Sequence, residues 1–146
     1  MNAAYPGAFM AGWGNLLGVD WWVQAVDHDA LFDPSHVSPS DLSAHLVGDP
    51  VLLPDIDVAL DGDVPVGVSC SAVDAASAVL LDVPASTAVR GVVVWAEAGP
   101  PFGDVLVCWL DRRRDRRPAA GVATGDPVAL WWPPDGVVVS IPTGGM

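Results

Sequence analysis

The chain has 146 residues, 51% of them hydrophobic, and a formal net charge of −12 at pH 7. This length fits one domain with its own core, and the apolar content excludes disorder for most of the chain. All six basic residues are Arg, and Glu97 is the one acidic residue that is not Asp. Such acidity argues against a nucleic-acid binder, because phosphate contacts need a basic surface.

Targeting signals and cysteine usage indicate the cellular compartment of the protein. No basic segment followed by an apolar run stands near Met1, and no apolar stretch approaches the ~18–20 residues of a membrane span. We therefore expect synthesis in the cytoplasm, without a classical secretion signal and without a membrane partner. Cys70 and Cys108 both have apolar neighbours, which favours buried free thiols over a disulfide.

The N-terminal part predicts one helix and one strand. Apolar residues in Gly7–Leu17 recur at helical spacing, which indicates a short helix. The segment Val19–Asp27 alternates as a strand does, with Trp21 and Trp22 on opposite faces. A loop rich in Asp and Pro follows over His28–Val37.

A second helix is predicted at 39–47. Ser38 has the position of an N-cap, Pro39 of the first helical residue and Asp41 of the third, which is the pattern of a capping box. The run Gly48-Asp49-Pro50 would end this helix.

Strands dominate the remainder. We expect strands at 51–60, 64–73 and 77–83, with an Asp-Gly hairpin turn at 61–63. The last third predicts a meandering antiparallel sheet, whose strands lie at 90–97, 105–110, 126–132 and 137–141. The predicted fold is a single mainly β domain over residues 1–146, an antiparallel β-sandwich or barrel-like domain with one or two short helices (helix and strand 7–27, helix 39–47, strands 51–141).

The order of these elements resembles a group of small virion structural proteins of tailed bacteriophages. Residues 19–27 are similar to an early (I/V)DW…(V)ALVD segment of that group, and residues 40–46 to a following helix. Residues 91–99 resemble its central strand, aLViYkDtG, and residues 104–111 the next one, pLiayiD. Residues 125–141 are similar to its final hairpin. The similarity runs over most of the chain, and the order of the segments carries it.

The resemblance implies a non-enzymatic role in the virion, on the head or in the tail. Partners would be other virion proteins, such as major capsid or tail subunits, and further copies of the chain. Two departures concern partner surfaces: Pro133-Pro134 in the last turn, and an Arg cluster where the group has a neutral Gly/Pro stretch.

That cluster holds five of the six Arg residues on a strongly acidic chain. Its charge is complementary to another copy or to an acidic neighbour, so we expect a subunit contact. A solvated hairpin loop and contact with DNA are the alternatives, the latter weak because no aromatic residues are interleaved. The Arg residues of the cluster are Arg112, Arg113, Arg114, Arg116 and Arg117.

Seven Trp residues also need a place. Neighbours on a strand face opposite sides, so Trp21 with Trp22, and Trp131 with Trp132, cannot all enter one core. We expect some of them, with Trp22, Trp131 and Trp132 as candidates, to lie at an interface or under a helix.

Catalytic and metal-binding patterns are not recognisable. The Asp clusters at 27–33 and 55–63 lack the spacing and closing Glu of a calcium loop. The three His residues lack zinc spacing, and Ser69-Cys70-Ser71 lacks the Gly that a nucleophile elbow needs after it. We expect no enzyme, no cofactor and no metal.

The sequence thus predicts a structural subunit of a bacteriophage virion, foremost a capsid decoration or cement protein. A minor tail or tail-tip protein is the first alternative. A carbohydrate- or receptor-binding β module, using its Trp residues as stacking platforms, is the second.

Overall fold

The computed structural model describes residues 2–7, 18–53, 56–61, 64–70, 79–81, 83–111, 121–122 and 128–130. In these residues the fold is mainly β, as the sequence predicts. The strands are β1 (Asn2–Ala4), β2 (Trp21–Asp27), β3 (Leu46–Leu53), β4 (Ile56–Asp61), β5 (Val64–Cys70), β6 (Val79–Leu81), β7 (Ala88–Glu97), β8 (Asp104–Leu110), β9 (Gly121–Val122) and β10 (Val128–Leu130), and a single 3-10 turn, η1, spans Pro39–Leu42.

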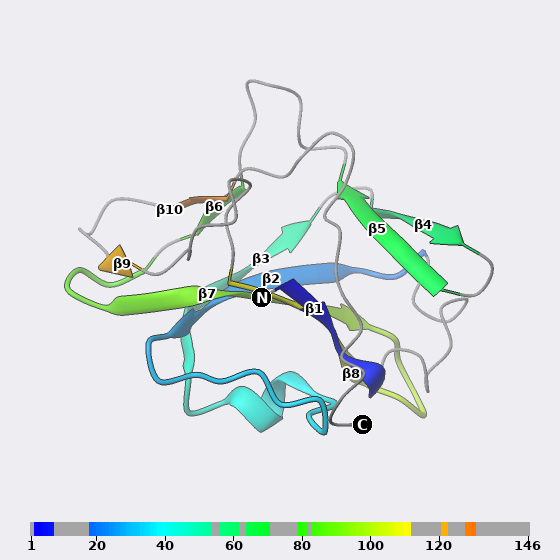
Figure 1. Ribbon diagram of the computed structural model, residues 1–146, viewed down its shortest axis with the longest axis horizontal. Helices are drawn as coiled ribbons and strands as arrows, with labels where there is room; N and C mark the ends of the chain where they lie inside the picture. Colours follow the sequence, from blue (N-terminus) through cyan, green and yellow to red (C-terminus); the bar gives the residue numbers. More distant parts are fainter. Residues whose placement is uncertain are drawn as a thin grey trace.

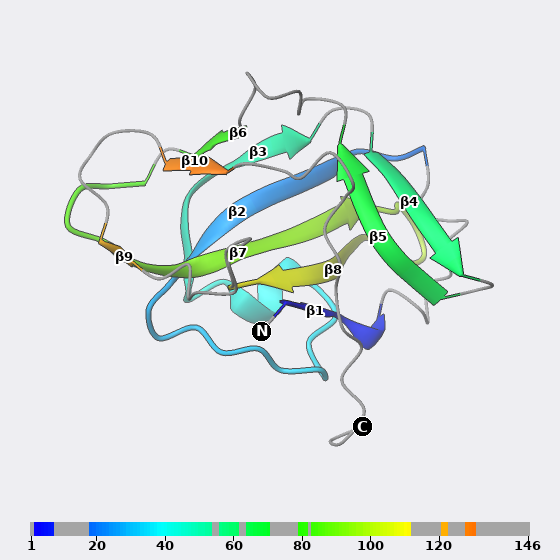
Figure 2. The ribbon, with the colours of Figure 1, turned by 45° about the horizontal axis from the view of Figure 1, so that its top comes forward.

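One antiparallel sheet forms the body of the molecule, with strand order β1-β8-β7-β2-β3 and β9 paired to the start of β7. Two small antiparallel pairs, β4 with β5 and β6 with β10, complete the described strands. Figure 1 shows these pairs on one side of the sheet and the segment that carries η1 on the other. In Figure 2 the long strands β2, β7 and β8 lie side by side. This sandwich-like arrangement leaves both faces of the central strands covered.

The segment 28–45, here called the strap, covers one face. Beneath it lies a core cluster to which β2, β7 and β8 each contribute. Trp22, Phe32 and Leu46 pack against this cluster from its margin. The buried residues of the cluster are Tyr5, Val26, Ala30, Leu42, Val93, Trp95, Leu106 and Trp109.

The opposite face is equally buried. Trp21 is 1% exposed and pairs across the sheet with Leu53 on one side and Ala96 on the other. Cys108 on β8 lies on this face, opposite Val94, as a buried free thiol, as predicted. The strict alternation of β2 therefore places two adjacent Trp side chains on two different buried faces.

The predicted helix at 39–47 is wrong beyond its first turn. The N-terminal half forms as expected: Ser38 caps η1, Pro39 is at its start, and Asp41 completes the capping box. Leu46 and Val47, however, pair with Val26 and Ala25 of β2. Backbone pairing within the sheet outweighs local helix propensity here, because two more apolar residues join its surface.

The strand pattern also differs from the prediction in its grouping. The predicted strand 51–60 is divided between β3 and β4, and Gly48-Asp49-Pro50 lies inside β3 instead of ending a helix. The 61–63 hairpin is confirmed, since Asp61 pairs with Val64. Within the described residues, the predicted meander is confirmed for β7 and β8, whereas β10 pairs with β6 and the outer edge of β8 is taken by β1. The predicted helix residues 8–17 and strand 137–141 lie outside the described residues.

Both long edges of the sheet are modified. At β3, three residues, Gly48 to Pro50, stand opposite Gln24 alone, forming a bulge into which the Gln24 amide donates a hydrogen bond to the Gly48 carbonyl. At β8, the Val37 carbonyl accepts the Leu106 N–H, and the Tyr5 N–H donates to the Val107 carbonyl beyond the end of β1. Bulges and covered edges disfavour the addition of a further strand to the long sheet.

Candidate interaction surface

The predicted interface residues divide into two groups. Trp22 lies in β2 within the described structure. The Arg cluster, Trp131 and Trp132 lie outside the described residues, so their predicted role stays a prediction.

Trp22 is half-buried at the margin of the strap face. It pairs in register with Trp95 on β7 and with Leu52 on β3, so the three side chains share that face. Its indole N–H is shielded from solvent and has no hydrogen-bond partner among the described residues. Leu52 beside it is 45% exposed. The apolar strap face therefore continues to the surface along the β3 edge.

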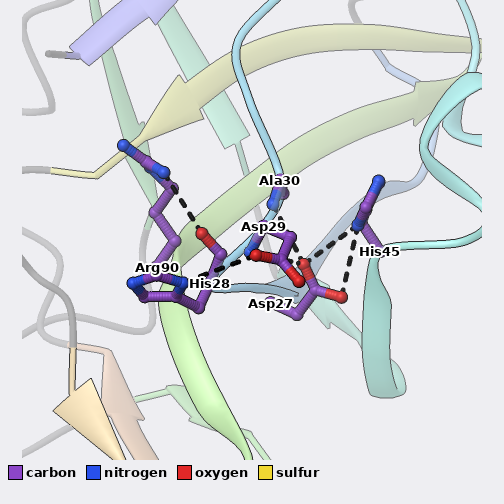
Figure 3. Close-up of polar contacts among 6 residues, drawn as sticks. All are labelled: Asp27, His28, Asp29, Ala30, His45 and Arg90. Carbon is purple, nitrogen blue, oxygen red and sulfur yellow. Dashed lines mark hydrogen bonds and ion pairs between the residues drawn. The ribbon is translucent and has the colours of Figure 1, made fainter.

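The strap is fastened where its two ends meet (Figure 3). The Asp27 carboxylate accepts the backbone N–H groups of Asp29 and Ala30, each at 3.0 Å. The same carboxylate contacts Nδ1 of His45, with oxygen–nitrogen distances of 3.0 and 3.3 Å. The Asp27 N–H in turn donates to the His45 carbonyl. Residues eighteen positions apart thus close the strap into a loop.

A second fastening joins the strap to β7. The His28 N–H donates to the Ala88 carbonyl, and the Arg90 guanidinium donates to the His28 carbonyl at 3.2 Å. Figure 3 shows Arg90 reaching the strap from β7. Hydrogen bonds to charged groups contribute more than neutral ones, so this end of the strap is held firmly.

Local hydrogen bonds shape the middle of the strap. The pKa of Asp33 is lowered, first because its carboxylate accepts the Ser35 hydroxyl and then because it accepts the Ser35 N–H. The pKa of Asp41 is lowered because its carboxylate accepts the N–H groups of Val37 and Ser38. Both carboxylates are therefore structural, and each fixes a turn in its charged form.

Large apolar side chains project from this framework at separate points. Leu31, 65% exposed, and Val37 project from the strap, Leu52 from β3, and Phe102 from the turn between β7 and β8. Single exposed apolar side chains are common on protein surfaces, so Phe102 is the most informative of the four, because aromatic residues are enriched at protein interfaces.

One end of the sheet combines such an anchor with three carboxylates. Glu97 and Asp104 stand directly opposite each other where β7 and β8 enter the turn. The Glu97 N–H donates to the Asp20 carbonyl, which brings the residue before β2 to the same end. All three acidic residues are exposed, and Phe102 lies in the turn they flank. We call Asp20, Glu97, Asp104 and the turn 98–103 the acidic end.

Negative charge prevails over the body as a whole. Residues 18–53 and 83–111 contain nine acidic residues and one basic residue, Arg90. A surface of this kind attracts cationic partners and repels anionic ones, DNA included.

The described residues contain few features of a metal-binding or catalytic site. No group of three or more His, Cys, Asp or Glu side chains there is arranged to hold a metal ion. Burial raises the pKa of the Cys108 thiol to about 12. Burial also raises the pKa of Tyr5, with Cys108 and Asp33 adding to the effect. Both groups stay protonated at neutral pH, which suits packing and not nucleophilic attack.

Sequence reasoning missed the acidic end and the Asp27–His45 contact. The strap contact links residues eighteen positions apart, and no sequence-spacing rule predicts such a contact. The acidic end had one visible signal: two acidic residues, Glu97 and Asp104, flank a Gly-Pro-Pro-Phe-Gly turn between apolar strands.

The described helical residues include no helix long and apolar enough to cross a membrane. No family model, curated protein sequence or solved structure matches the chain. The site must therefore be interpreted from its own geometry.

Proposed function

We propose that the chain is a non-enzymatic structural component of a tailed-bacteriophage virion, and specifically a capsid decoration or cement subunit. In this role it binds other virion proteins through exposed anchors and charged surfaces on a rigid β body. It is made in the host cytoplasm and ends in the particle.

One observation supports this proposal most. Three of the segments that resemble the virion group, 19–27, 91–99 and 104–111, cover the adjoining central strands β2 and β8 and most of β7. The resemblance thus concerns the core of the sheet and not scattered surface residues. A sheet buried on both faces and modified at both edges also suits a subunit that presents fixed contact points to its neighbours.

The location within the particle separates this proposal from its nearest alternative, a minor tail or tail-tip protein. Both roles need the same rigid body and the same anchors. They differ in copy number and position, which are properties of the particle.

The experiment is to label the protein in purified virions of the phage that encodes it. Quantitative mass spectrometry gives its copy number, and antibody-gold electron microscopy gives its position. Many copies over the head are expected for a decoration subunit. A few copies at the tail would assign the alternative role and overturn the capsid assignment, and absence from the particle would overturn the virion role altogether.

A further inference from the structure

All three histidines of the chain belong to the strap. Each has a ring nitrogen within 4 Å of an Asp carboxylate. Histidine is the side chain whose charge ordinarily changes between about pH 5 and pH 8, so a modest change of pH acts on this segment. The pairs are His28 with Asp29 at 3.6 Å, His36 with Asp33 at 3.8 Å, and His45 with Asp27 at 3.0 Å.

Protonation of these side chains removes most of the charge of the segment. Residues 27–45 contain four Asp residues and no Arg, so their net charge is −4 with neutral His and −1 with three protonated His. Repulsion among the carboxylates then falls, and each carboxylate next to a His gains an opposite charge. Mild acid therefore favours the closed arrangement of the strap.

One of the three pairs joins the two ends of the strap. His45 Nδ1 contacts the Asp27 carboxylate, which also accepts the N–H groups of Asp29 and Ala30 (Figure 3). An ionised carboxylate can only accept, so Nδ1 carries the hydrogen in this contact. A second proton, on Nε2, makes the ring an imidazolium and the contact a charge-assisted hydrogen bond, roughly twice as strong as a neutral one.

The pair at the start of the strap is looser. The side chains of His28 and Asp29 are largely exposed, and water screens a pair of this kind. Those of His45 and Asp27 are closer together and 38% and 30% exposed. They are thus better shielded, while His45 keeps enough contact with solvent to take up a proton.

The pair in the middle of the strap acts on turns that are already fixed. Hydrogen bonds from Ser35 to Asp33, and from backbone N–H groups to Asp41, lower the pKa of each carboxyl, and nearby His36 adds to this effect. The Tyr5 hydroxyl, at the end of β1, faces the same carboxylate of Asp33 and stays protonated. His36 therefore contributes to local turns and does not join the ends of the strap.

The charged groups around His45 leave Asp27 as its counter-charge. From β7, the Arg90 guanidinium reaches the strap but donates to the His28 carbonyl. At the start of the strap, His28 stands against Asp29. β3 begins directly after His45 with two apolar residues. Uptake of a proton at His45 is therefore felt first by the carboxylate that holds both ends of the strap.

We propose that the strap is a pH-responsive cover, held more tightly over the core cluster near pH 5.5 than near pH 7.5, and that His45 is the residue whose protonation tightens it. Local opening of the strap would separate Phe32 from Tyr5 and Trp109, the aromatic rings it lies against. The inference concerns the fold of one copy and does not depend on the virion role.

Hydrogen exchange measured by NMR at pH 5.5 and pH 7.5 tests the inference. Each rate is divided by the intrinsic rate of that amide at the same pH, which gives a protection factor. The reporters are the amides of Asp27, Asp29 and Ala30, since they donate to the His45 carbonyl or to the Asp27 carboxylate. Their protection should be about three- to fivefold higher at pH 5.5, as a charge pair of this exposure supplies. Amides of β8 are the internal reference and should change less.

Two matched variants locate the effect. His45→Asn keeps a neutral N–H donor in place of Nδ1 but cannot become charged. Its strap amides should be protected as in the unmodified protein at pH 7.5, without the gain at pH 5.5. His28→Asn removes the exposed His of the looser pair by the same substitution, and should keep the gain.

Other outcomes overturn the inference. Equal protection of the strap amides at the two pH values in the unmodified protein would show that the strap does not respond. A gain that survives in His45→Asn would exclude His45 as the responsive residue. An equal change in the β8 amides would mean that pH acts on the whole fold and not on the strap. None of these results affects the virion role, which the particle labelling tests separately.

Discussion

At the scale of single residues, a close approach between β7 and the end of β8 depends on the missing side chain of Gly91. A Cβ at Gly91 would lie 2.3 Å from the Leu110 carbonyl oxygen and 2.9 Å from the Asp111 Cα, so β7 and β8 could not keep their spacing. Gly18 has a positive φ, but a Cβ at that position would meet no atom within 4 Å.

We therefore expect Gly91→Ala to lower the free energy of unfolding by about 2–3 kcal/mol, the cost of forcing extra volume into a packed site. Gly18→Ala should cost about 1 kcal/mol, from the left-handed backbone conformation alone. Urea unfolding of both variants measures the difference. Equal losses would mean that the strand spacing adjusts without cost.

The thiol of Cys108 gives a second prediction at this scale. Its burial and its pKa of about 12 keep it protonated and inaccessible at pH 8. In a Cys70→Ser background, the remaining thiol should react with a soluble disulfide reagent only as fast as the protein unfolds. The same sample in denaturant, which should show one reactive thiol, is the control. Rapid reaction of the native protein would place Cys108 near the surface.

Asp41 gives a prediction about acid stability. Its folded-state pKa is lowered by the N–H groups of Val37 and Ser38, so its stabilising contribution is present above the unfolded pKa of about 4. That contribution is lost as the pH falls through the lower, folded pKa. Asp41→Asn should therefore be less stable than the unmodified protein at pH 7, and the gap should narrow on titration from pH 5 to pH 2. The midpoints of urea unfolding across this pH range measure the difference in stability. A constant difference would contradict a stabilising role for the ionised Asp41 carboxylate.

At the scale of elements, two adjacent residues of the strap lie on opposite sides, one packed on the core and one exposed to solvent. Phe32 packs on Tyr5, with ring centroids 4.9 Å apart, and lies 6.3 Å from Trp109 at an edge-on angle. Leu31 next to it is 65% exposed. The strap thus anchors the core with one side chain and presents the next to solvent.

We expect Phe32→Ala to destabilise the protein by about 2–3 kcal/mol, below the range for a fully buried aromatic because Phe32 is half-buried. Leu31→Ser should change stability by less than about 0.5 kcal/mol, as surface substitutions do. Thermal unfolding of the two variants tests whether Phe32 packs in the core and Leu31 faces solvent. A larger loss for Leu31→Ser would mean that the strap faces the other way.

The elements that could be predicted are those that local chemistry decides. The β-branched and aromatic content of 90–97 and 105–110, with the turn residues between them, identified β7 and β8, and Ser38, Pro39 and Asp41 identified the start of η1. The rest depended on partners distant in the chain. Leu46 and Val47 became strand residues because β2 offered them an edge, and β1 took the edge of β8 that a meander would have given to β10.

The candidate surface likewise divides into features that the local sequence predicts and features that depend on strand order. Composition alone indicated an acidic chain with a concentrated Arg segment. That Asp20 joins Glu97 and Asp104 at one end of the sheet follows from strand order and register, which no single segment encodes.

At the scale of the whole molecule, the described residues 18–53 and 83–111 form an acidic body, with nine acidic residues and one basic residue. β1, the strap and the β3 bulge discourage strand addition along the edges of the long sheet. Contacts between copies through the Arg cluster, which the sequence predicts, should therefore be electrostatic contacts that salt weakens.

The most direct test is the mass of the unmodified protein in solution, measured by light scattering at low salt and at ~1 M salt, where exposed charge pairs are largely screened. A subunit contact through the Arg cluster, as the sequence predicts, would give a mass above that of the 15.1 kDa chain at low salt, rising with concentration and falling towards the monomer at high salt. A strict monomer under both conditions, or an oligomer indifferent to salt, would contradict self-association through the Arg cluster.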